Sequence, residues 1–265
     1  MKNLCLLFFI MLGLSSCQWG VPNKVAEKTF DTLHYEYKVI KARAADCGTK
    51  PDSACTVVKI NYPFFDNAKA LNDTITRKIT VMFAMDGKPD SSLELMTKKF
   101  LKSYDDFKKD DSRSGMFFTL EDSVKVIHQD SSLTALQVSG YSYQGGAHGG
   151  SFTGFINWDT KAGKNLKLAD IFATGYHDKL TAVAEKVFRK NEKLSDTASL
   201  KDNYFFKDDK FAINDNFSVT PLGIKFLYNQ YEIKPYAAGI TELFIPYAQI
   251  KSLIQPGSVV SQFIK

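Results

Sequence analysis

The chain has 265 residues, and its 34 Lys and Arg exceed its 29 Asp and Glu to give a formal net charge of +5. Hydrophobic residues make up 44% and charged residues 24%, a globular balance that excludes a disordered, collagen-like or polytopic membrane protein. So small a positive surplus, without a basic cluster, argues against nucleic acid as a partner.

The beginning of the chain is typical of an exported, lipid-anchored protein. The apolar run Leu4–Leu14 is too short to span a bilayer but fits the hydrophobic region of a signal peptide. It ends in Leu14-Ser15-Ser16-Cys17, which resembles the lipobox of bacterial lipoproteins. We expect a signal peptide over 1–16, membrane-anchoring acyl chains on Cys17 and a tether over 17–29. An ordinary signal peptide with an incidental cysteine is the alternative.

The four cysteines divide by role. Cys5 leaves with the signal peptide and Cys17 takes lipid, so Cys47 and Cys55 remain as a pair. An even pair in an exported protein predicts a disulfide, which would stabilise the fold by ~2–3 kcal/mol across so short a loop. A metal or redox pair is the alternative, although the spacing is wider than Cys-x-x-Cys and no further cysteine could complete a site.

Alternating and helical periodicities predict the first elements. Alternation over 33–39 and 56–62 predicts two strands, which flank the cysteine loop and would form a hairpin closed by the disulfide. Apolar residues three and four apart predict amphipathic helices over 68–82 and 93–107. Ser91 and Glu94 predict a capping box at the start of the second helix.

The rest of the chain is predicted to be mainly strands. The order of elements indicates an α+β fold of antiparallel sheets packed with helices, in two closely associated subdomains. A polar, mixed segment over 191–215 is predicted to be a loop with a short helix. The remaining expected strands are 124–128, 136–143, 152–158, 224–228 and 243–247, with helices at 180–188 and 250–254.

A glycine-rich segment, Gly140–Gly150, is the densest local motif, with five glycines in eleven residues. Such a backbone can take positive φ angles easily. The spacing does not fit a phosphate-binding loop, and a Ser151–His148 nucleophilic pair lacks the Gly-x-Ser-x-Gly elbow. We interpret the segment as a turn or bulge whose His148 bonds to nearby backbone, and a ligand-contacting loop is the alternative.

Metal and paired-carboxylate chemistry are not predicted. The four histidines form no His-x-x-x-His pair, and we expect no metal and no cofactor. Adjacent carboxylates such as Asp105-Asp106 lie among lysines and are interpreted as solvated faces, because neighbouring residues do not converge on one substrate bond.

Longer motifs carry a family resemblance. Tyr141-x-Tyr143-x-Gly145-Gly146-Ala-His148-Gly149 and Tyr231-Glu-Ile-x-Pro235-Tyr236-Ala-Ala-Gly239 resemble the RsiV-type ectodomains of anti-sigma factors. The segment before them resembles the domain that precedes the catalytic domain in PdaC-type deacetylases. The resemblance places a PdaC-type domain at 30–144, an RsiV-type domain at 145–255 and a tail at 256–265.

The resemblance implies a function in the cell envelope. RsiV-type ectodomains bind lysozyme, but the cytoplasmic and membrane-spanning parts of that family and the PdaC-type catalytic motifs have no match in this sequence. We therefore expect a lipid-anchored, non-enzymatic envelope binding module whose partner is a lysozyme-like protein or a cell-wall glycan. An envelope hydrolase with a site around His148 is the alternative. Gln18, in place of Asp after Cys17, favours the outer membrane.

Aromatic side chains are the predicted contacts for either partner, because they offer flat amphipathic surface. The tyrosines considered are Tyr141, Tyr143, Tyr228, Tyr231, Tyr236 and Tyr247, and at least half of them are expected in the core rather than at a site. The candidate binding residues are Tyr141, Tyr143, Gly145, Gly146, His148, Tyr231 and Tyr236.

Overall fold

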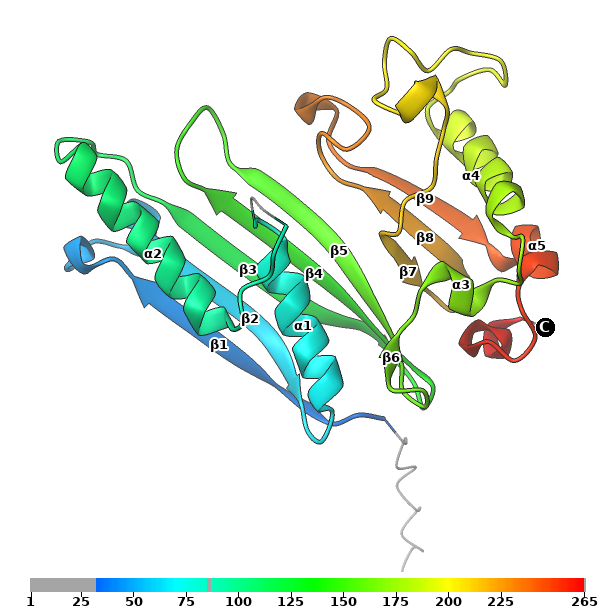
Figure 1. Cartoon of the computed structure of the whole chain (residues 1–265), viewed down its shortest axis with the longest axis horizontal. Helices are drawn as coiled ribbons and strands as arrows, with labels where there is room; N and C mark the ends of the chain where they lie inside the picture. Colours follow the sequence, from blue (N-terminus) through cyan, green and yellow to red (C-terminus); the bar gives the residue numbers. More distant parts are fainter. Residues whose placement is uncertain (1–31, 85–86, 265) are drawn as a thin grey trace, which may run out of the picture. The chain divides into compact units, whose positions relative to one another are not determined.

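The computed structural model describes residues 32–84 and 87–264, and Asp31–Lys265 forms one compact unit. The predicted signal peptide, the lipid site at Cys17 and the whole of the tether lie outside the described residues. Two β-sheets packed with helices confirm the α+β prediction (Figure 1).

The first sheet has six strands in sequence order. Its pairings are antiparallel except that β2 and β3 run parallel. The sheets are antiparallel as predicted except at this pair, because two helices connect β2 to β3 and return the chain in the same direction. The strands are β1 (Tyr35–Arg43), β2 (Val57–Phe65), β3 (Thr119–Gln129), β4 (Leu133–Tyr143), β5 (Gly150–Asp159) and β6 (Lys164–Asn165).

The two connecting helices, α1 (Lys69–Val81) and α2 (Leu93–Asp110), cover one face of this sheet (Figure 1). Their apolar stripes form a hydrophobic cluster with the strand residues of that face, such as Ile60. The predicted capping box is wrong by one position: Ser92 caps α2, and its hydroxyl accepts a hydrogen bond from the Leu95 backbone N–H at 3.1 Å.

The second sheet is antiparallel in the order β7 (Phe217–Val219), β8 (Gly223–Tyr228) and β9 (Thr241–Pro246). A second hydrophobic cluster joins it to α4 (His177–Asn191) and to the short helices α3 (Leu168–Ile171) and α5 (Tyr247–Ile250). Single 3-10 turns lie at Ala45–Cys47, Asp52–Ala54, Lys207–Asp209, Tyr236–Ala238, Lys251–Leu253 and Val259–Phe263.

The segment 191–215 is more buried than its polar composition predicted. Tyr204, Phe206 and Phe211 are each at most 8% exposed and pack around Phe188 of α4. The segment therefore completes the second core, although it has a single 3-10 turn and no α-helix of its own.

A buried asparagine joins the two sheets. Asn157 of β5 is 2% exposed; its Nδ2 donates to the Phe217 carbonyl at 2.8 Å, and its Oδ1 accepts from the Val219 N–H at 2.7 Å. One side chain thus bonds both ends of β7 and fixes the second sheet against β5.

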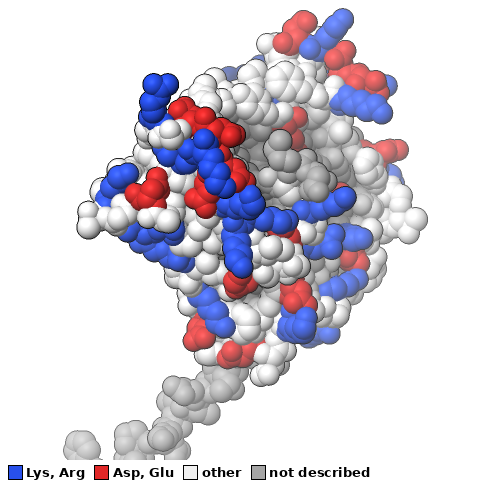
Figure 2. Space-filling model, turned by 60° about the vertical axis from the view of Figure 1, so that its left-hand side comes forward, with Lys and Arg blue, Asp and Glu red and all other residues white. Residues whose placement is uncertain are grey.

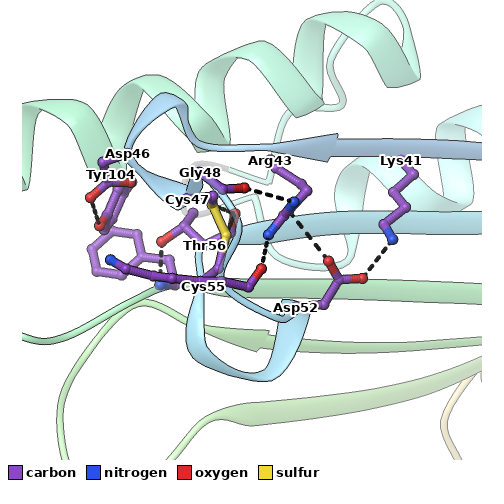
Figure 3. The surroundings of a disulfide bond; sticks show 11 residues. Lys41, Arg43, Asp46, Cys47, Gly48, Asp52, Cys55, Thr56 and Tyr104 are labelled. Carbon is purple, nitrogen blue, oxygen red and sulfur yellow. Dashed lines mark hydrogen bonds and ion pairs between the residues drawn. A yellow bond between two sulfur atoms is a disulfide. The ribbon is translucent and has the colours of Figure 1, made fainter.

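The connection between β1 and β2 is closed by a disulfide between Cys47 and Cys55, whose Cα atoms are 5.4 Å apart (Figure 3). Within the loop that the disulfide closes, Asp52 accepts a hydrogen bond from Lys41 at 2.6 Å, and this hydrogen bond is the main reason that the pKa of Asp52 is lowered. On the helix side, the Tyr104 hydroxyl of α2 donates to Asp46 at 2.8 Å. These contacts tie the loop to the sheet and to α2.

On the face shown in Figure 2, Lys and Arg side chains are interspersed with Asp and Glu side chains. On α2, Lys102 and Lys109 both pair with Asp106. Within the described part of the chain, no helix has the length and apolar character needed to cross a bilayer.

Candidate functional site

The glycine-rich loop reverses the chain between β4 and β5. Gly145 and Gly146 have φ angles of 102° and 90°, which lie in the region that residues with a Cβ avoid. The two glycines therefore allow a tight return, and His148 follows at the exposed end of the loop.

A second loop, between β8 and β9, meets the first. Tyr231 has a φ of 65°, an uncommon value for a bulky residue that surrounding contacts must hold in place. Asn229 supplies one such contact, since its side chain pairs with the N–H and the carbonyl of Thr153 on β5 at 2.7 and 3.1 Å. Lys234 supplies another through an ion pair with Glu192 at 2.9 Å.

These loops bring together three rings, His148, Tyr231 and Tyr236, which we call the aromatic cluster. The His148 ring stacks on Tyr236 with centroids 3.9 Å apart and planes 17° from parallel. Tyr231 lies 6.2 Å from His148 and 5.5 Å from Tyr236. His148 and Tyr231 are exposed, and Tyr231 keeps 59% of its surface, so this stacking leaves aromatic surface open to a partner.

Both ring nitrogens of His148 lie within hydrogen-bond distance of a partner. Its Nδ1 lies 3.0 Å from the Gly149 carbonyl, which can only accept, so Nδ1 carries the proton. Nε2 is then an acceptor and lies 3.4 Å from the Tyr231 hydroxyl. These two contacts orient the ring so that Nε2 points toward Tyr231.

A cavity of about 320 Å³ lies beside the aromatic cluster. Phe83 and Phe152 line the cavity with apolar surface, while Ser151 contributes a hydroxyl group and Gln230 an amide group. This mixture, apolar surface with a few polar groups, is the usual lining of a small-ligand site. We call it the aromatic cavity.

The other predicted tyrosines do not join the cluster. Tyr141 packs against Gly149, where a Cβ would lie 2.4 Å from its hydroxyl. The Tyr143 hydroxyl donates to the Gly146 carbonyl at 3.2 Å and supports the loop. Tyr228 and Tyr247 are at most 5% exposed and belong to the second core, where burial raises the pKa of each.

The remaining histidines are dispersed. His34, His128 and His177 each contact one nearby aspartate, Asp66, Asp130 and Asp178 respectively. Over 32–84 and 87–264, no group of three or more His, Cys, Asp and Glu side chains is placed to hold a metal ion.

A buried carboxylate in the first core is not among the residues that the sequence motifs predicted. Asp122 is 3% exposed, and in the described part of the chain no hydrogen-bond partner is found for either of its oxygens. Burial raises the pKa of Asp122 to about 7. The available signal was its position between Leu120 and Val124, which puts it on the apolar side of an alternating strand.

Comparisons with family models cover both halves of the site. Residues 49–151, which include His148, match the model described as deacetylase PdaC. Residues 169–248, which include Tyr231 and Tyr236, match a model described as a protein of unknown function, DUF3298. The RsiV-type resemblance and lysozyme binding stay predictions.

A curated relative, the peptidoglycan-N-acetylmuramic acid deacetylase PdaC of Bacillus subtilis, is 24% identical over 201 residues. The match covers 74% of this chain and 38% of the relative, so the chain spans well under half of that protein. The prediction of a non-enzymatic protein is contradicted, because this relative and the matching family model are both named for a deacetylase.

Two solved structures share the fold. A DUF3298 family member from Bacteroides fragilis has a TM-score of 0.68 at 22% identity, covering 88% of this chain and 97% of its own. A DUF3298 family protein from Pseudomonas aeruginosa has a TM-score of 0.67 at 25% identity, covering 84% and 95%.

Proposed function

We propose that this chain binds a sugar of peptidoglycan in the aromatic cavity. The single observation that carries the proposal is the aromatic cluster of His148, Tyr231 and Tyr236, which lines a cavity that also has polar groups. The name of the Bacillus subtilis relative supplies the substrate class, since it refers to the N-acetylmuramic acid of peptidoglycan.

The chemistry of the cavity suits a sugar. A pyranose ring has an apolar face of C–H groups, which packs on aromatic rings, and a rim of hydroxyl and amide groups, which needs hydrogen bonds. The aromatic cluster offers the rings, while Ser151 and Gln230 offer the polar partners. Because Asn229 and Lys234 already hold the second loop, little ordering entropy is lost when a ligand binds.

A second candidate function is hydrolysis of an N-acetyl amide bond of the bound glycan, which the positions of the His148 ring nitrogens favour. With Nδ1–H bonded to Gly149, the lone pair of Nε2 faces the Tyr231 hydroxyl, and a water molecule that takes the place of this hydroxyl would give its proton to Nε2. Attack of that water on an N-acetyl carbonyl breaks the amide bond and forms acetate and an amine. The proton held by His148 then passes to the leaving nitrogen, so the step is balanced by water alone.

Substitutions at His148 separate the two functions. In titrations of the full chain with the disaccharide of N-acetylglucosamine and N-acetylmuramic acid, we expect His148→Ala and Tyr236→Ala to weaken binding by about tenfold, since each removes one ring of a stacked pair. His148→Phe keeps a ring to stack but has no nitrogen, so binding persists while any acetate release is lost. His177→Ala, an exposed histidine on α4, is the matched control.

The outcomes are distinct. Disaccharide binding that is equal in the unaltered chain, His148→Ala and Tyr236→Ala would rule out the aromatic cavity as the site. Acetate release at an undiminished rate from the His148→Phe variant would rule out His148 as the base and leave the binding proposal in place.

We also propose that the chain works in the cell envelope, anchored by lipid on Cys17, with the outer membrane as its location. The Leu14-Ser15-Ser16-Cys17 motif supports this. Mass spectrometry of the protein from cell membranes tests it, because lipidation adds acyl chains to Cys17 as the new first residue. A protein that retains residues 1–16 and an unmodified Cys17 contradicts it.

A further inference from the structure

A second cavity, of about 480 Å³, crosses four strands of the first sheet from β2 to β5. Its lining side chains alternate along the strands with residues of the first core, such as Ile60 and Val138. Because successive side chains of a strand point to opposite faces, the cavity lies on the face opposite α1 and α2. We call it the sheet groove.

The register of the sheet explains the shape of the groove. Asn61, Ser123, Ser139 and Thr153 are cross-strand partners, so one row of small polar side chains runs across β2, β3, β4 and β5. The neighbouring row begins with Lys59 opposite Glu121 and continues through Tyr141 to Ser151. The small row therefore forms a floor lined by hydroxyl and amide groups.

The charges of the groove suit a ligand that is largely neutral. Lys59 and Glu121 are directly opposed across the β2–β3 pair, so their charges offset each other. The side chains of the floor, Asn61, Ser123, Ser139 and Thr153, carry no charge, and the side chain of Asp122 is on the opposite face of β3, toward α1. A row of neutral donors and acceptors matches the hydroxyl groups along a polysaccharide better than it matches a nucleic acid or an acidic peptide.

The groove and the aromatic cavity adjoin. Both are lined by Ser151 and Phe152 at the start of β5. At that end β5 has no strand beside it in the described part of the sheet, since β6 pairs only with Trp158 and Asp159. Tyr141, 37% exposed and packed on Gly149, lies at the junction and offers a further aromatic surface.

We infer that the sheet groove binds the continuation of the same glycan strand, so that the ligand is an oligosaccharide of about four sugars. The inference rests on the proposed function. Neighbouring strands are about 4.8 Å apart, so four strands span about 14 Å, and a β-1,4-linked sugar advances a glycan by about 5 Å. Three sugars therefore cross the groove while a fourth lies in the aromatic cavity.

The test is the dependence of affinity on glycan length. Full chain is titrated with β-1,4-linked N-acetylglucosamine oligomers of one to six sugars and with glycan strands released from peptidoglycan. We expect the affinity to rise at least tenfold between two and four sugars and then to level. This titration series uses the unaltered chain, so its result does not depend on whether any variant folds.

A substitution in the floor locates the effect. Ser123→Tyr places a ring in the centre of the small row, and we expect it to remove the gain between two and four sugars while the disaccharide binds as before. Lys125→Tyr, two residues along the same face of β3 and outside the groove, is the matched control.

The two proposals fail separately. If the disaccharide binds but longer oligomers bind no more tightly, the inference about the sheet groove is overturned and the proposed function stands. If oligomers of every length fail to bind, the proposed function is overturned and the inference with it. A loss of affinity for long oligomers in Lys125→Tyr equal to that in Ser123→Tyr also contradicts the inference.

Discussion

Each face of the first sheet has a buried polar side chain, and the two side chains differ in whether they are hydrogen-bonded. On the face toward the second sheet, Asn157 is 2% exposed and both ends of its amide are bonded to β7. On the face toward α1, Asp122 is 3% exposed and has no hydrogen-bond partner for either oxygen among the described residues. The sheet thus combines a satisfied polar contact with an unsatisfied one.

The difference follows from what each side chain meets. An amide has a donor and an acceptor, so Asn157 can replace a backbone partner for a neighbouring strand. An ionised carboxylate can only accept, and Asp122 instead meets Met82 and Phe83 above Gly140, in the space that a Cβ there would fill. Burial of a polar group is costly unless it is paired. We conclude that the inter-sheet contact stabilises the fold and that Asp122 costs stability.

The largest expected effect comes from removing the ionisable group of Asp122. Its pKa is raised by burial from 3.8 to about 7, so the folded chain keeps a proton that the unfolded chain has already lost. Stability therefore falls as the pH rises from 4 to 7, by on the order of 4 kcal/mol. Asp122→Asn should match the unaltered chain near pH 4 and exceed its free energy of unfolding by about that amount at pH 8.

Urea unfolding at pH 4, 6 and 8 measures this, and Glu121→Gln is the matched control. Glu121 is the preceding residue of β3 and is exposed on the opposite face, so its substitution should leave the pH dependence nearly unchanged. If Asp122→Asn and the unaltered chain differ equally at all three pH values, Asp122 does not titrate in this range and the contrast with Asn157 is wrong.

The next largest effect is expected from removing the hydrogen-bonded amide of Asn157. Asn157→Ala leaves the Phe217 carbonyl and the Val219 N–H buried without their partner, and we expect a loss of about 3 kcal/mol in the free energy of unfolding. Asn165→Ala is the control, because Asn165 is exposed and its side chain accepts one bond, from the Asn157 N–H at 2.9 Å. Equal losses in the two variants would mean that the inter-sheet bonds contribute little.

Local sequence patterns were sufficient to predict most helices and strands, but not which strands pair or in which direction they run. The periodicity of 68–82 and 93–107 predicted both helices to within a few residues, because each buries one stripe against the sheet. The parallel β2–β3 pair was missed, because alternation reports which face a residue takes and carries no information on strand direction. The buried aromatics of 191–215 were missed because irregular segments have no period to detect.

The candidate site was predictable in its residues but not in its geometry. The motifs nominated His148, Tyr231 and Tyr236 together, and the structure stacks their rings. Tyr141 and Tyr143 came from the same motif, yet one packs on Gly149 and the other supports the loop. Which tyrosines meet depends on two loops that are about 80 residues apart in the chain, and that proximity is set by tertiary packing through contacts such as Asn229.

The smallest effect is expected from removing the Cys47–Cys55 disulfide, which is a covalent link on the opposite face of the sheet from the hydrogen bonds of Asn157. The Cys47–Cys55 disulfide belongs to the hydrophobic cluster of the α1 face and constrains a short loop, so Cys47→Ala with Cys55→Ala should lower the free energy of unfolding by about 2–3 kcal/mol. A reducing agent should lower the stability of the unaltered chain similarly and leave that double variant unchanged. Because the disulfide and Asn157 share no partners, adding Asn157→Ala to the double variant should give the sum of the two losses. A combined loss more than about 0.5 kcal/mol away from that sum would show that the two faces of the sheet are coupled, contrary to the comparison.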